Sequence, residues 1–222
     1  MQVKFLRKEH IGSNVWEFFF ATESPLQYMA GQYVDVTIID VKDYRRELTR
    51  TFSLTSVPSD NFISFATFFP DDSSSYKKRL LAMKQGDAAK ISESMGDMVL
   101  PRSSNQPLIF VAGGLGIASF IAPLRQCARI ILSHDVTLLW ALRNEVDRLN
   151  FPVLNEFRFA YRSEYVAPKR LGVAEILERA GSTGKVYVSG SQNFTESIVS
   201  ELRAHGLPDT RLAFDYFTNY LG

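Results

Sequence analysis

The chain has 222 residues, of which 45% are hydrophobic and 22% are charged, and its formal net charge is +1. This composition is typical of a globular protein long enough for two modest domains, and the near-neutral charge argues against a general nucleic-acid binder. Cys127 is the one cysteine of the chain, which excludes an internal disulfide and a four-cysteine iron–sulfur cluster.

The N-terminal residues lack a signal-peptide core, and the apolar runs of the chain are too short to span a membrane. We therefore expect a cytoplasmic protein.

The first half of the chain is a series of predicted strands separated by turns. Aromatic and β-branched runs predict strands at residues 14–20, 32–39, 50–56, 62–69 and 88–92. Five or six such strands make a small barrel, and we expect an antiparallel β-barrel of six strands.

The second of these strands has two distinct faces. Gln32, Val34, Val36 and Ile38 share one face, which is the expected core side because it carries most of the apolar residues. The charged residues 40–48 that follow predict a hairpin loop.

The third strand begins with Arg50, Thr51, Phe52 and Ser53, which combine a cation, an aromatic ring and two hydroxyls. A guanidinium can neutralise a phosphate, a ring can pack on a planar cofactor, and a hydroxyl can hydrogen-bond a ring nitrogen. These four residues therefore suit a flat, anionic ligand such as a flavin nucleotide. In a regular strand Arg50 and Phe52 face one side and the two hydroxyls the other, so we predict a local bend there.

A short helix is predicted at residues 77–84, with Ser74, Ser75 and Tyr76 at its N-terminus. One hydroxyl can cap the helix without any ligand. The same hydroxyls and exposed N–H groups can hold a pyrophosphate, and the two roles are compatible because only one hydroxyl caps. A pyrophosphate at this place would indicate FAD rather than FMN.

The second half of the chain alternates strands with helices. Strands are predicted at residues 107–112, 136–142 and 185–189, and helices at residues 117–125 and 172–180. This alternation predicts a doubly wound parallel sheet. Prolines and serines cluster between the two halves, which places the predicted domains at residues 1–102 and 103–222.

A glycine-rich turn joins the first of these strands to its helix. Gly113, Gly114 and Gly116, followed by Ile117, let a ligand approach the backbone at the positive end of a helix, as a pyrophosphate requires. The match to the full dinucleotide fingerprint is incomplete, because Ser119 occupies the third glycine position. The sequence therefore predicts a variant phosphate-binding turn.

The strand at residues 136–142 ends in Arg143, with Glu145 and Asp147 just beyond. A cation at such a strand end favours a 2′-phosphate and an acidic residue favours a free ribose hydroxyl. The charges can also be those of a solvated loop. The choice between NADPH and NADH is therefore open.

The order and spacing of these motifs resemble the ferredoxin:NADP reductase superfamily, whose members carry a flavin-binding barrel followed by a nicotinamide-binding domain. The segments that carry the resemblance are residues 31–34, 50–53, 74–77 with 86–87, 113–117 and 215–220. The resemblance covers nearly the whole chain and corresponds to the two-domain form without an iron–sulfur domain.

This resemblance implies an NAD(P)H-dependent, FAD-containing reductase. NADPH or NADH would reduce FAD, which would pass electrons to a separate acceptor such as ferredoxin or flavodoxin. A flavin reductase and an electron-transfer subunit of a larger complex are alternatives. A nucleotide-binding sensing module with little turnover is an alternative of another class.

The resemblance also implies roles for single residues. Arg50 would hold a flavin phosphate, Phe52 would pack on the isoalloxazine, and Ser53 would hydrogen-bond near its N5. Ser189 and Gly190 occupy the place of the family's C-G-P, where the cysteine lies beside the nicotinamide.

Three further expectations concern the end of the chain. Asp215 takes the place of the family's glutamate. Together with Ser53 and Ser189, it is a candidate catalytic residue. Tyr220 is a terminal aromatic residue that would cover the flavin, or would only pack on the last strand. Residues 193–196 read as a capping box that opens a helix.

Overall fold

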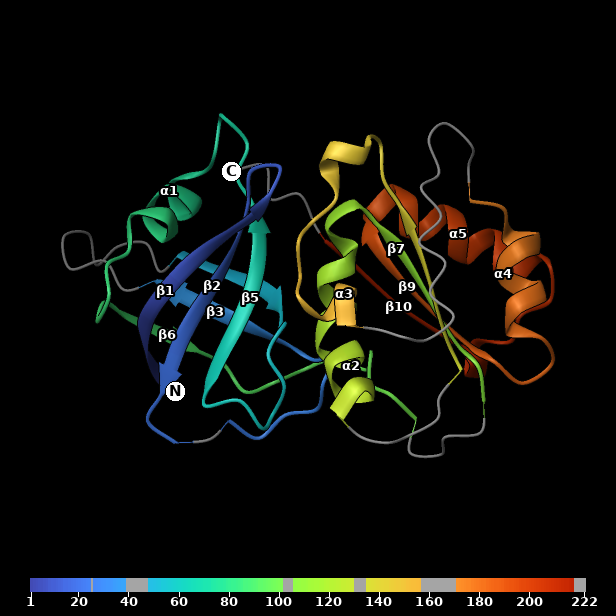
Figure 1. Cartoon of the computed structure of the whole chain (residues 1–222), viewed down its shortest axis with the longest axis horizontal. Helices are drawn as coiled ribbons and strands as arrows, with labels where there is room; N and C mark the ends of the chain where they lie inside the picture. Colours follow the sequence, from blue (N-terminus) through green and yellow to red (C-terminus); the bar gives the residue numbers. More distant parts are fainter. Residues whose placement is uncertain (25, 39–47, 102–105, 130–134, 157–170, 218–222) are drawn as a thin grey trace.

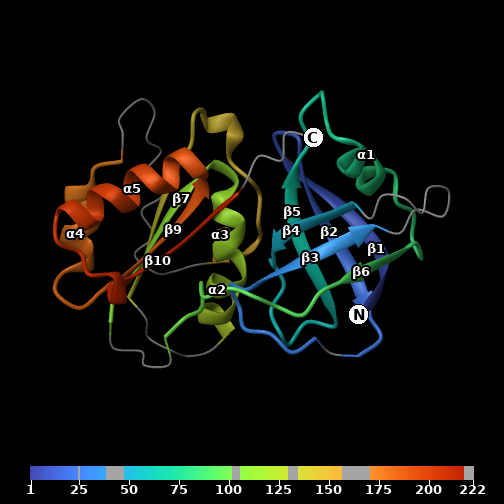
Figure 2. The same cartoon turned by 180° about the vertical axis from the view of Figure 1, so that it is seen from behind.

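The computed structural model describes residues 1–24, 26–38, 48–101, 106–129, 135–156 and 171–217. These residues form an antiparallel and a parallel sheet that lie side by side (Figure 1 and Figure 2). The predicted hairpin loop lies almost wholly outside the described residues. The predicted domain boundary also falls outside them, at residues 102–105, and stays a prediction.

The N-terminal sheet has six strands in the order β4-β3-β6-β1-β2-β5, and all neighbours are antiparallel. Leu54 forms a bridge with Phe65, which joins the two ends of this order into a barrel. The predicted six-stranded barrel is therefore confirmed. The strands are β1 Gln2–Gly12, β2 Val15–Thr22, β3 Tyr33–Ile38, β4 Leu48–Ser53, β5 Phe62–Phe68 and β6 Ala88–Ile91.

Aromatic rings fill the barrel. Phe18, Phe20 and Phe65 are almost fully buried, and the Phe65 ring lies nearly parallel to each of the other two rings. From β3, Val34 and Val36 point into the same core, as the alternation predicted. This close-packed core holds β4, the strand that carries Arg50, in place.

Helix α1 (Ser75–Ala82) covers one end of the barrel. The Ser74 hydroxyl accepts a hydrogen bond from the Lys77 backbone N–H at 3.4 Å, so the predicted capping role is confirmed for this serine. Tyr76 and Leu80 lie one turn apart on the buried face of the helix.

The C-terminal sheet has four parallel strands in the order β10-β9-β7-β8. They are β7 Leu108–Gly113, β8 Val136–Ala141, β9 Lys185–Ser191 and β10 Leu212–Phe217. The helical segments are η1 Gly114–Ile117, α2 Ala118–Arg129, η2 Glu145–Asp147, α3 Val153–Glu156, α4 Val173–Ala180, α5 Gln192–Ala204 and η3 Asp209–Arg211. This α/β domain is the predicted doubly wound parallel sheet.

Helices cover both faces of this sheet. Figure 1 and Figure 2 show α2 and α3 on the face toward the barrel and α4 and α5 on the other. Alternate residues of the strands divide between two apolar clusters, with Phe110 on the α2 side and Val111 on the α4 side. Burial on both faces explains the continuous apolar runs of β7 and β8.

The predicted capping box at residues 193–196 is wrong in register. Helix α5 begins at Gln192, and its cap is Ser191, whose hydroxyl accepts from the Phe194 backbone N–H at 3.4 Å. A serine here supplies the acceptor that a helix N-terminus needs.

An apolar interface and an ion pair hold the barrel against the α/β domain. Ile11, Val15 and Ala66 on the outside of the barrel belong to the same buried cluster as Phe110 and the residues of α2. On α2, the Arg125 guanidinium donates to both carboxylate oxygens of Asp60, at 2.7 and 3.1 Å. Shared apolar burial and a two-point ion pair fix the angle between the domains.

A buried carboxylate lies beside this interface. Glu17 is 8% exposed, and the Thr55 hydroxyl donates to its Oε1 at 2.6 Å. Burial raises the pKa of the Glu17 carboxyl above its ordinary value of 4.5, and hydrogen bonds from Thr55 and Ser64 offset this only in part. The charged form is therefore disfavoured in the folded protein.

Replacing Glu17 by glutamine is expected to stabilise the protein increasingly as the pH rises. In the wild type, this group's contribution to stability is full below the unfolded-state pKa and is lost as the pH rises through the raised folded-state pKa. Glutamine keeps an acceptor for Thr55 and does not titrate. Urea unfolding of both proteins at about pH 5 and about pH 8 measures the effect. A difference between them that is the same at both pH values would contradict it.

Candidate functional site

A cleft of about 1190 Å³ lies between the barrel and the α/β domain. Arg50, Ser53 and Lys77 line it from the barrel, and Gly113 and Gly116 line it from the α/β domain. The cleft therefore brings together the two motifs that the sequence singled out.

The topology of the parallel sheet explains why the cleft lies there. From β7 the chain crosses to β8 on one side, and from β9 it crosses to β10 on the other. The turns after β7 and β9 therefore diverge, and ligands of doubly wound sheets bind at such a switch point. Gly114 from the first turn, and Ser191 and Phe194 from the second, all line the cleft.

The barrel wall of the cleft carries two neighbouring cations. Arg50 lies in β4 and Lys77 in the first turn of α1, next to the capping residue Ser74. Burial and the Arg50 charge both lower the pKa of the Lys77 amine, while Asp72 acts in the opposite direction. The two positive charges repel each other, and both lie near a helix N-terminus. A bound anion would therefore be stabilised there and would offset the repulsion.

The predicted bend at residues 50–53 is wrong. Strand β4 pairs with β3 residue by residue, from Leu48 opposite Ile38 to Ser53 opposite Tyr33, without a register shift. Phe52 consequently points into the barrel, where its ring stacks on Phe65 at a centroid distance of 4.2 Å. Phe52 is 8% exposed, although it is among the residues that line the cleft.

The opposite face of β4 presents hydroxyls to the cleft. Thr51 donates to the Asp35 carboxylate at 2.5 Å, and Ser53 lies 3.0 Å from the Ser119 hydroxyl of α2. Ser119 in turn lies 3.1 Å from the Ser189 hydroxyl of β9. Ser53, the last residue of β4, therefore links the barrel to the α/β domain.

Two glycines of the turn after β7 are required by geometry. Gly114 has a φ of +53°, a left-handed conformation that glycine adopts without strain. A Cβ on Gly116 would lie 2.1 Å from the Ser189 carbonyl oxygen, so only glycine lets η1 approach β9 this closely. The turn is therefore shaped by close backbone packing as well as by its conformation.

Trp140 holds this turn from the neighbouring strand β8. Its indole N–H donates to the Gly114 carbonyl at 2.8 Å, and the residue is 2% exposed. The bond fixes the peptide that follows Gly114, at the edge of the cleft. No sequence motif points to Trp140, because the contact depends on the pairing of β7 with β8.

Replacing Trp140 by phenylalanine is expected to lower the free energy of unfolding by about 1–3 kcal/mol, since the Gly114 carbonyl loses its donor and a void remains in place of the buried indole. Urea unfolding measures the change. Trp16→Phe is the matched control, because Trp16 is only partly buried at the edge of the barrel core. Equal losses in the two variants would contradict a special role for the Trp140 bond.

Asp215 lines the cleft from β10, where it pairs with Ser189 of β9. Burial raises the pKa of the Asp215 carboxyl, and a hydrogen bond from the Tyr216 backbone N–H partly offsets this. Tyr216 and Phe217 also line the cleft. The C-terminal segment up to Phe217 is therefore part of the site.

Two of the three charged residues singled out after β8, Arg143 and Asp147, line the cleft. Arg143 lines the cleft and is exposed. Asp147 also lines it, but its carboxylate accepts from the Asn144 backbone N–H at 3.2 Å and from the Ser13 hydroxyl at 3.0 Å. Glu145 is exposed and is not among the residues that line the cleft.

Several predicted site residues do not line the cleft. Tyr76 is fully buried in the barrel, and its hydroxyl donates to the Val36 carbonyl at 3.0 Å. Ser75 is exposed on the helix, and Ile117 is buried in the α/β core. Ser189 is fully buried behind the cleft wall.

Gly190 packs against Gly113 and the Phe194 ring behind the same wall. Tyr220 lies outside the described residues, so its predicted place over a flavin stays a prediction. The predicted residues that do line the cleft are Arg50, Thr51, Phe52, Ser53, Ser74, Gly113, Gly114, Gly116, Arg143 and Asp215.

Sequence reasoning missed other residues of the cleft. Lys77 belongs to the segment 74–77 that carries the family resemblance but was not named as a site residue, although its place three positions after the capping serine could have identified it. Tyr33, Phe68 and Phe194 add aromatic surface to the walls. Their positions follow from the strand pairing and helix packing, which no local motif reveals.

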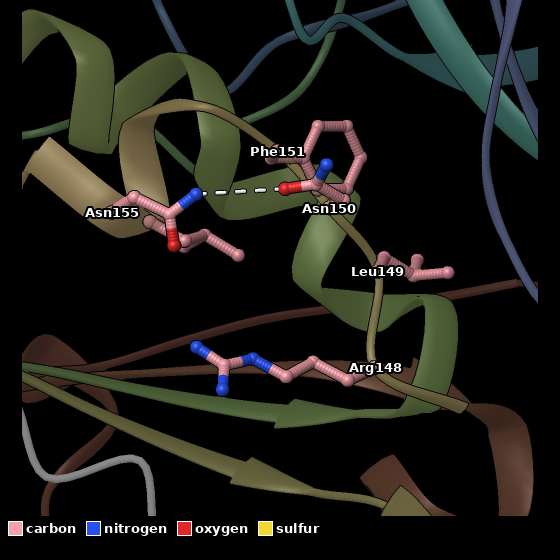
Figure 3. Close-up of a pocket in the computed structure, with 6 residues that line it drawn as sticks. Arg148, Leu149, Asn150, Phe151 and Asn155 are labelled. Atoms are coloured by element: carbon pink, nitrogen blue, oxygen red, sulfur yellow. Dashed lines mark hydrogen bonds between the residues drawn. The ribbon is translucent and has the colours of Figure 1, made fainter. Parts of the chain in front are cut away.

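A second, smaller pocket of about 220 Å³ is lined by residues between Arg148 and Asn155 (Figure 3). Figure 3 shows the Asn155 amide directed toward Asn150, to which it donates at 3.5 Å. A single short segment forms this pocket, whereas the large cleft gathers residues from both domains.

The described residues contain no cluster of side chains that could hold a metal ion. No group of three or more His, Cys, Asp or Glu side chains in them is placed to hold a metal ion. Cys127 is buried, and burial raises the pKa of its thiol to about 11. No helix in the described ranges is long and apolar enough to cross a membrane.

No protein-family model matches the chain. Among curated relatives, the toluate 1,2-dioxygenase electron transfer component of Pseudomonas putida is 24% identical over 219 residues, covering 89% of this chain and 61% of that protein. A probable flavin reductase of Aliivibrio fischeri is 27% identical over 138 residues, covering 60% of this chain and 56% of that protein. The chain matches less than two thirds of the length of either relative.

Solved structures share the whole fold. Flavohemoglobin from Malassezia yamatoensis, with bound FAD and heme, matches with a TM-score of 0.79 and 17% identity, over 98% of this chain and 60% of that chain. Ferredoxin-NADP+ reductase from Plasmodium falciparum, with 2'P-AMP, matches with a TM-score of 0.77 and 16% identity, over 97% of this chain and 95% of that chain. At such identities the likeness shows the fold, a barrel followed by a parallel α/β domain.

Proposed function

We propose that this chain, whose homologues and structural neighbours are ferredoxin–NADP reductase-like reductases, is an NAD(P)H-dependent flavin reductase component. It binds FAD and NAD(P)H in the cleft and passes electrons to a separate acceptor. The observation that carries the proposal is that one cleft combines a cationic helix N-terminus on the barrel with a glycine turn on the parallel sheet. Each wall suits one of the two nucleotides.

The barrel wall fits the flavin nucleotide. Arg50, Lys77 and the N-terminus of α1 would hold its pyrophosphate, because two clustered cations there favour an anion. Ser53 would lie beside the ring and hydrogen-bond it from the end of β4. When bound, the flavin supplies the hydride acceptor and the electrons that leave the protein.

The opposite wall fits the nicotinamide nucleotide. Gly113, Gly114 and Gly116 let a pyrophosphate approach the backbone at the start of η1 and α2. Arg143 offers its charge to the cleft, whereas the Asp147 carboxylate is engaged by Asn144 and Ser13. This favours NADPH over NADH.

The acceptor is proposed to be a partner protein, such as a ferredoxin, a flavodoxin or an oxygenase subunit. One relative is an electron transfer component of a dioxygenase, and another is a probable flavin reductase. Free flavin is therefore the second candidate acceptor.

Purified protein reconstituted with FAD, freed of excess flavin and assayed with NADPH tests this function. The expected result is a flavin spectrum that stays with the protein, and faster electron transfer to ferredoxin than to free FMN. A faster rate with FMN favours the second candidate. Retained flavin without turnover on any acceptor supports a sensing module instead, and failure to retain FAD contradicts the proposal.

A further inference from the structure

A chain of three buried serine hydroxyls crosses the boundary between the barrel and the α/β domain. Ser119 Oγ lies 3.0 Å from Ser53 Oγ and 3.1 Å from Ser189 Oγ. The exposed fractions of Ser53, Ser119 and Ser189 are 6%, 1% and 0%. Ser119 stands in the first turn of α2, between the end of β4 and the end of β9. Its hydroxyl therefore links one strand of each domain.

The hydroxyl of Ser119 needs these partners. A buried hydroxyl destabilises the fold unless it is hydrogen-bonded, and alanine at this position would avoid the problem. Within the described part of the chain, both hydrogen bonds found for this hydroxyl go to the other two serines. Neither bond caps the helix, so the local structure of α2 does not explain the residue.

The number of protons limits the hydrogen bonds that the three hydroxyls can make at one time. Each serine has one proton to donate and can accept through its oxygen. Ser119 lies between two hydroxyls, so it donates to only one of them at a time. When it donates to Ser53, the Ser53 proton is free to point into the cleft. When it donates to Ser189, Ser53 donates to Ser119 and presents a lone pair to the cleft.

We propose that Ser119 is a positioning residue, whose hydroxyl sets whether Ser53 offers a proton or a lone pair to the cofactor ring. The inference rests on the proposed function and deepens it. A flavin ring nitrogen accepts a hydrogen bond in the oxidised state and donates one in the reduced state. A serine that bonds this nitrogen in both states must therefore donate in the first state and accept in the second. The Ser53–Ser119–Ser189 chain reverses by rotating three hydroxyls, without moving the backbone.

Crystal structures of the ligand-free Ser119→Ala and Ser56→Ala variants test the positioning without any cofactor. Ser56 is a matched control, because it is fully buried and its hydroxyl bonds Tyr28 and the Ser64 backbone, away from the cleft. The Ser53 side chain is expected to leave its wild-type rotamer, or to occupy more than one, only in Ser119→Ala. An unchanged single rotamer of Ser53 in Ser119→Ala overturns the proposal.

Midpoint potentials and anaerobic reduction rates of the FAD-loaded variants test the role in the reaction. Ser119→Ala is expected to shift the flavin potential and to slow its reduction by NADPH about three- to tenfold, the effect of one hydrogen bond. Ser56→Ala should leave both unchanged. In a Ser53→Ala background, Ser119→Ala should have no further effect, because Ser119 acts through Ser53.

The outcomes separate the two proposals. Bound flavin with wild-type potential and rate in Ser119→Ala overturns this inference and leaves the proposed function intact. Additive effects of the two substitutions also overturn it. A wild-type protein that retains no FAD overturns the proposed function instead, while the rotamer of Ser53 still decides whether Ser119 positions it.

Discussion

Replacing Lys77 by methionine is expected to weaken FAD binding about 10- to 100-fold, the loss of one charge-assisted hydrogen bond to a phosphate. Lys77 lines the cleft beside Arg50, and its amine has a lowered pKa because of burial and the Arg50 charge. A bound pyrophosphate would relieve this repulsion. The interaction of Lys77 with the anion should therefore be more favourable than that of an isolated surface lysine. Titration of the apoprotein with FAD measures the dissociation constant.

Lys78→Met is the matched control. Lys78 is the next residue of α1, is exposed and does not line the cleft. Its replacement should change the FAD affinity less than about twofold, because an exposed charge outside the site is screened by salt. Equal losses in the two variants would contradict an anion site at Lys77 and would indicate only a general charge effect.

Replacing Gly116 by alanine is expected to lower the free energy of unfolding by about 3 kcal/mol or more. The new Cβ would lie 2.1 Å from the Ser189 carbonyl oxygen and 2.8 Å from the Gly190 Cα. These are backbone atoms of a central strand, so neither can move without breaking the pairing of β9 with β7 and β10. Urea unfolding measures the loss, and a variant that folds should also bind NADPH more weakly.

Gly172→Ala serves as the control for that substitution. Gly172 precedes α4, and a Cβ there would meet no atom within 4 Å. Its replacement should lower the free energy of unfolding by about 1 kcal/mol or less, the difference between glycine and alanine at a helix N-cap. A Gly116→Ala variant as stable as Gly172→Ala would contradict the close packing of the turn on β9.

Much of the fold followed from local patterns in the sequence. Continuous apolar runs predicted the buried strands β7 and β8, and alternation predicted the core face of β3. Strand β1 was not placed individually, because a register shift between Phe5 and Arg7 interrupts its alternation. Strand β10 was read as a motif only, because an edge strand at the end of the chain has one neighbour and partly exposed residues.

The site was predictable only in part. Arg50, Ser53, Ser74 and the glycine turn stood out because each carries chemistry at a strand or helix end. Tyr76 was wrongly grouped with the hydroxyls, although its spacing to Leu80 indicates a buried helix face.

Contacts between segments distant in the sequence could not be predicted. The Trp140 bond to Gly114 depends on β7 pairing with β8, and the bonds of Ser119 depend on the packing of the two domains. No local pattern carries that information, because each contact is made by elements that meet only in the folded chain.

Anaerobic titration of the FAD-reconstituted protein with NADPH, and separately with NADH, tests whether the cleft brings a hydride donor to a bound flavin. If the cleft holds both nucleotides as proposed, one equivalent of NADPH should bleach the visible absorbance of the bound flavin, and NADH should do so more slowly. A flavin that stays oxidised under both donors would contradict a hydride-accepting site between the barrel and the glycine turn.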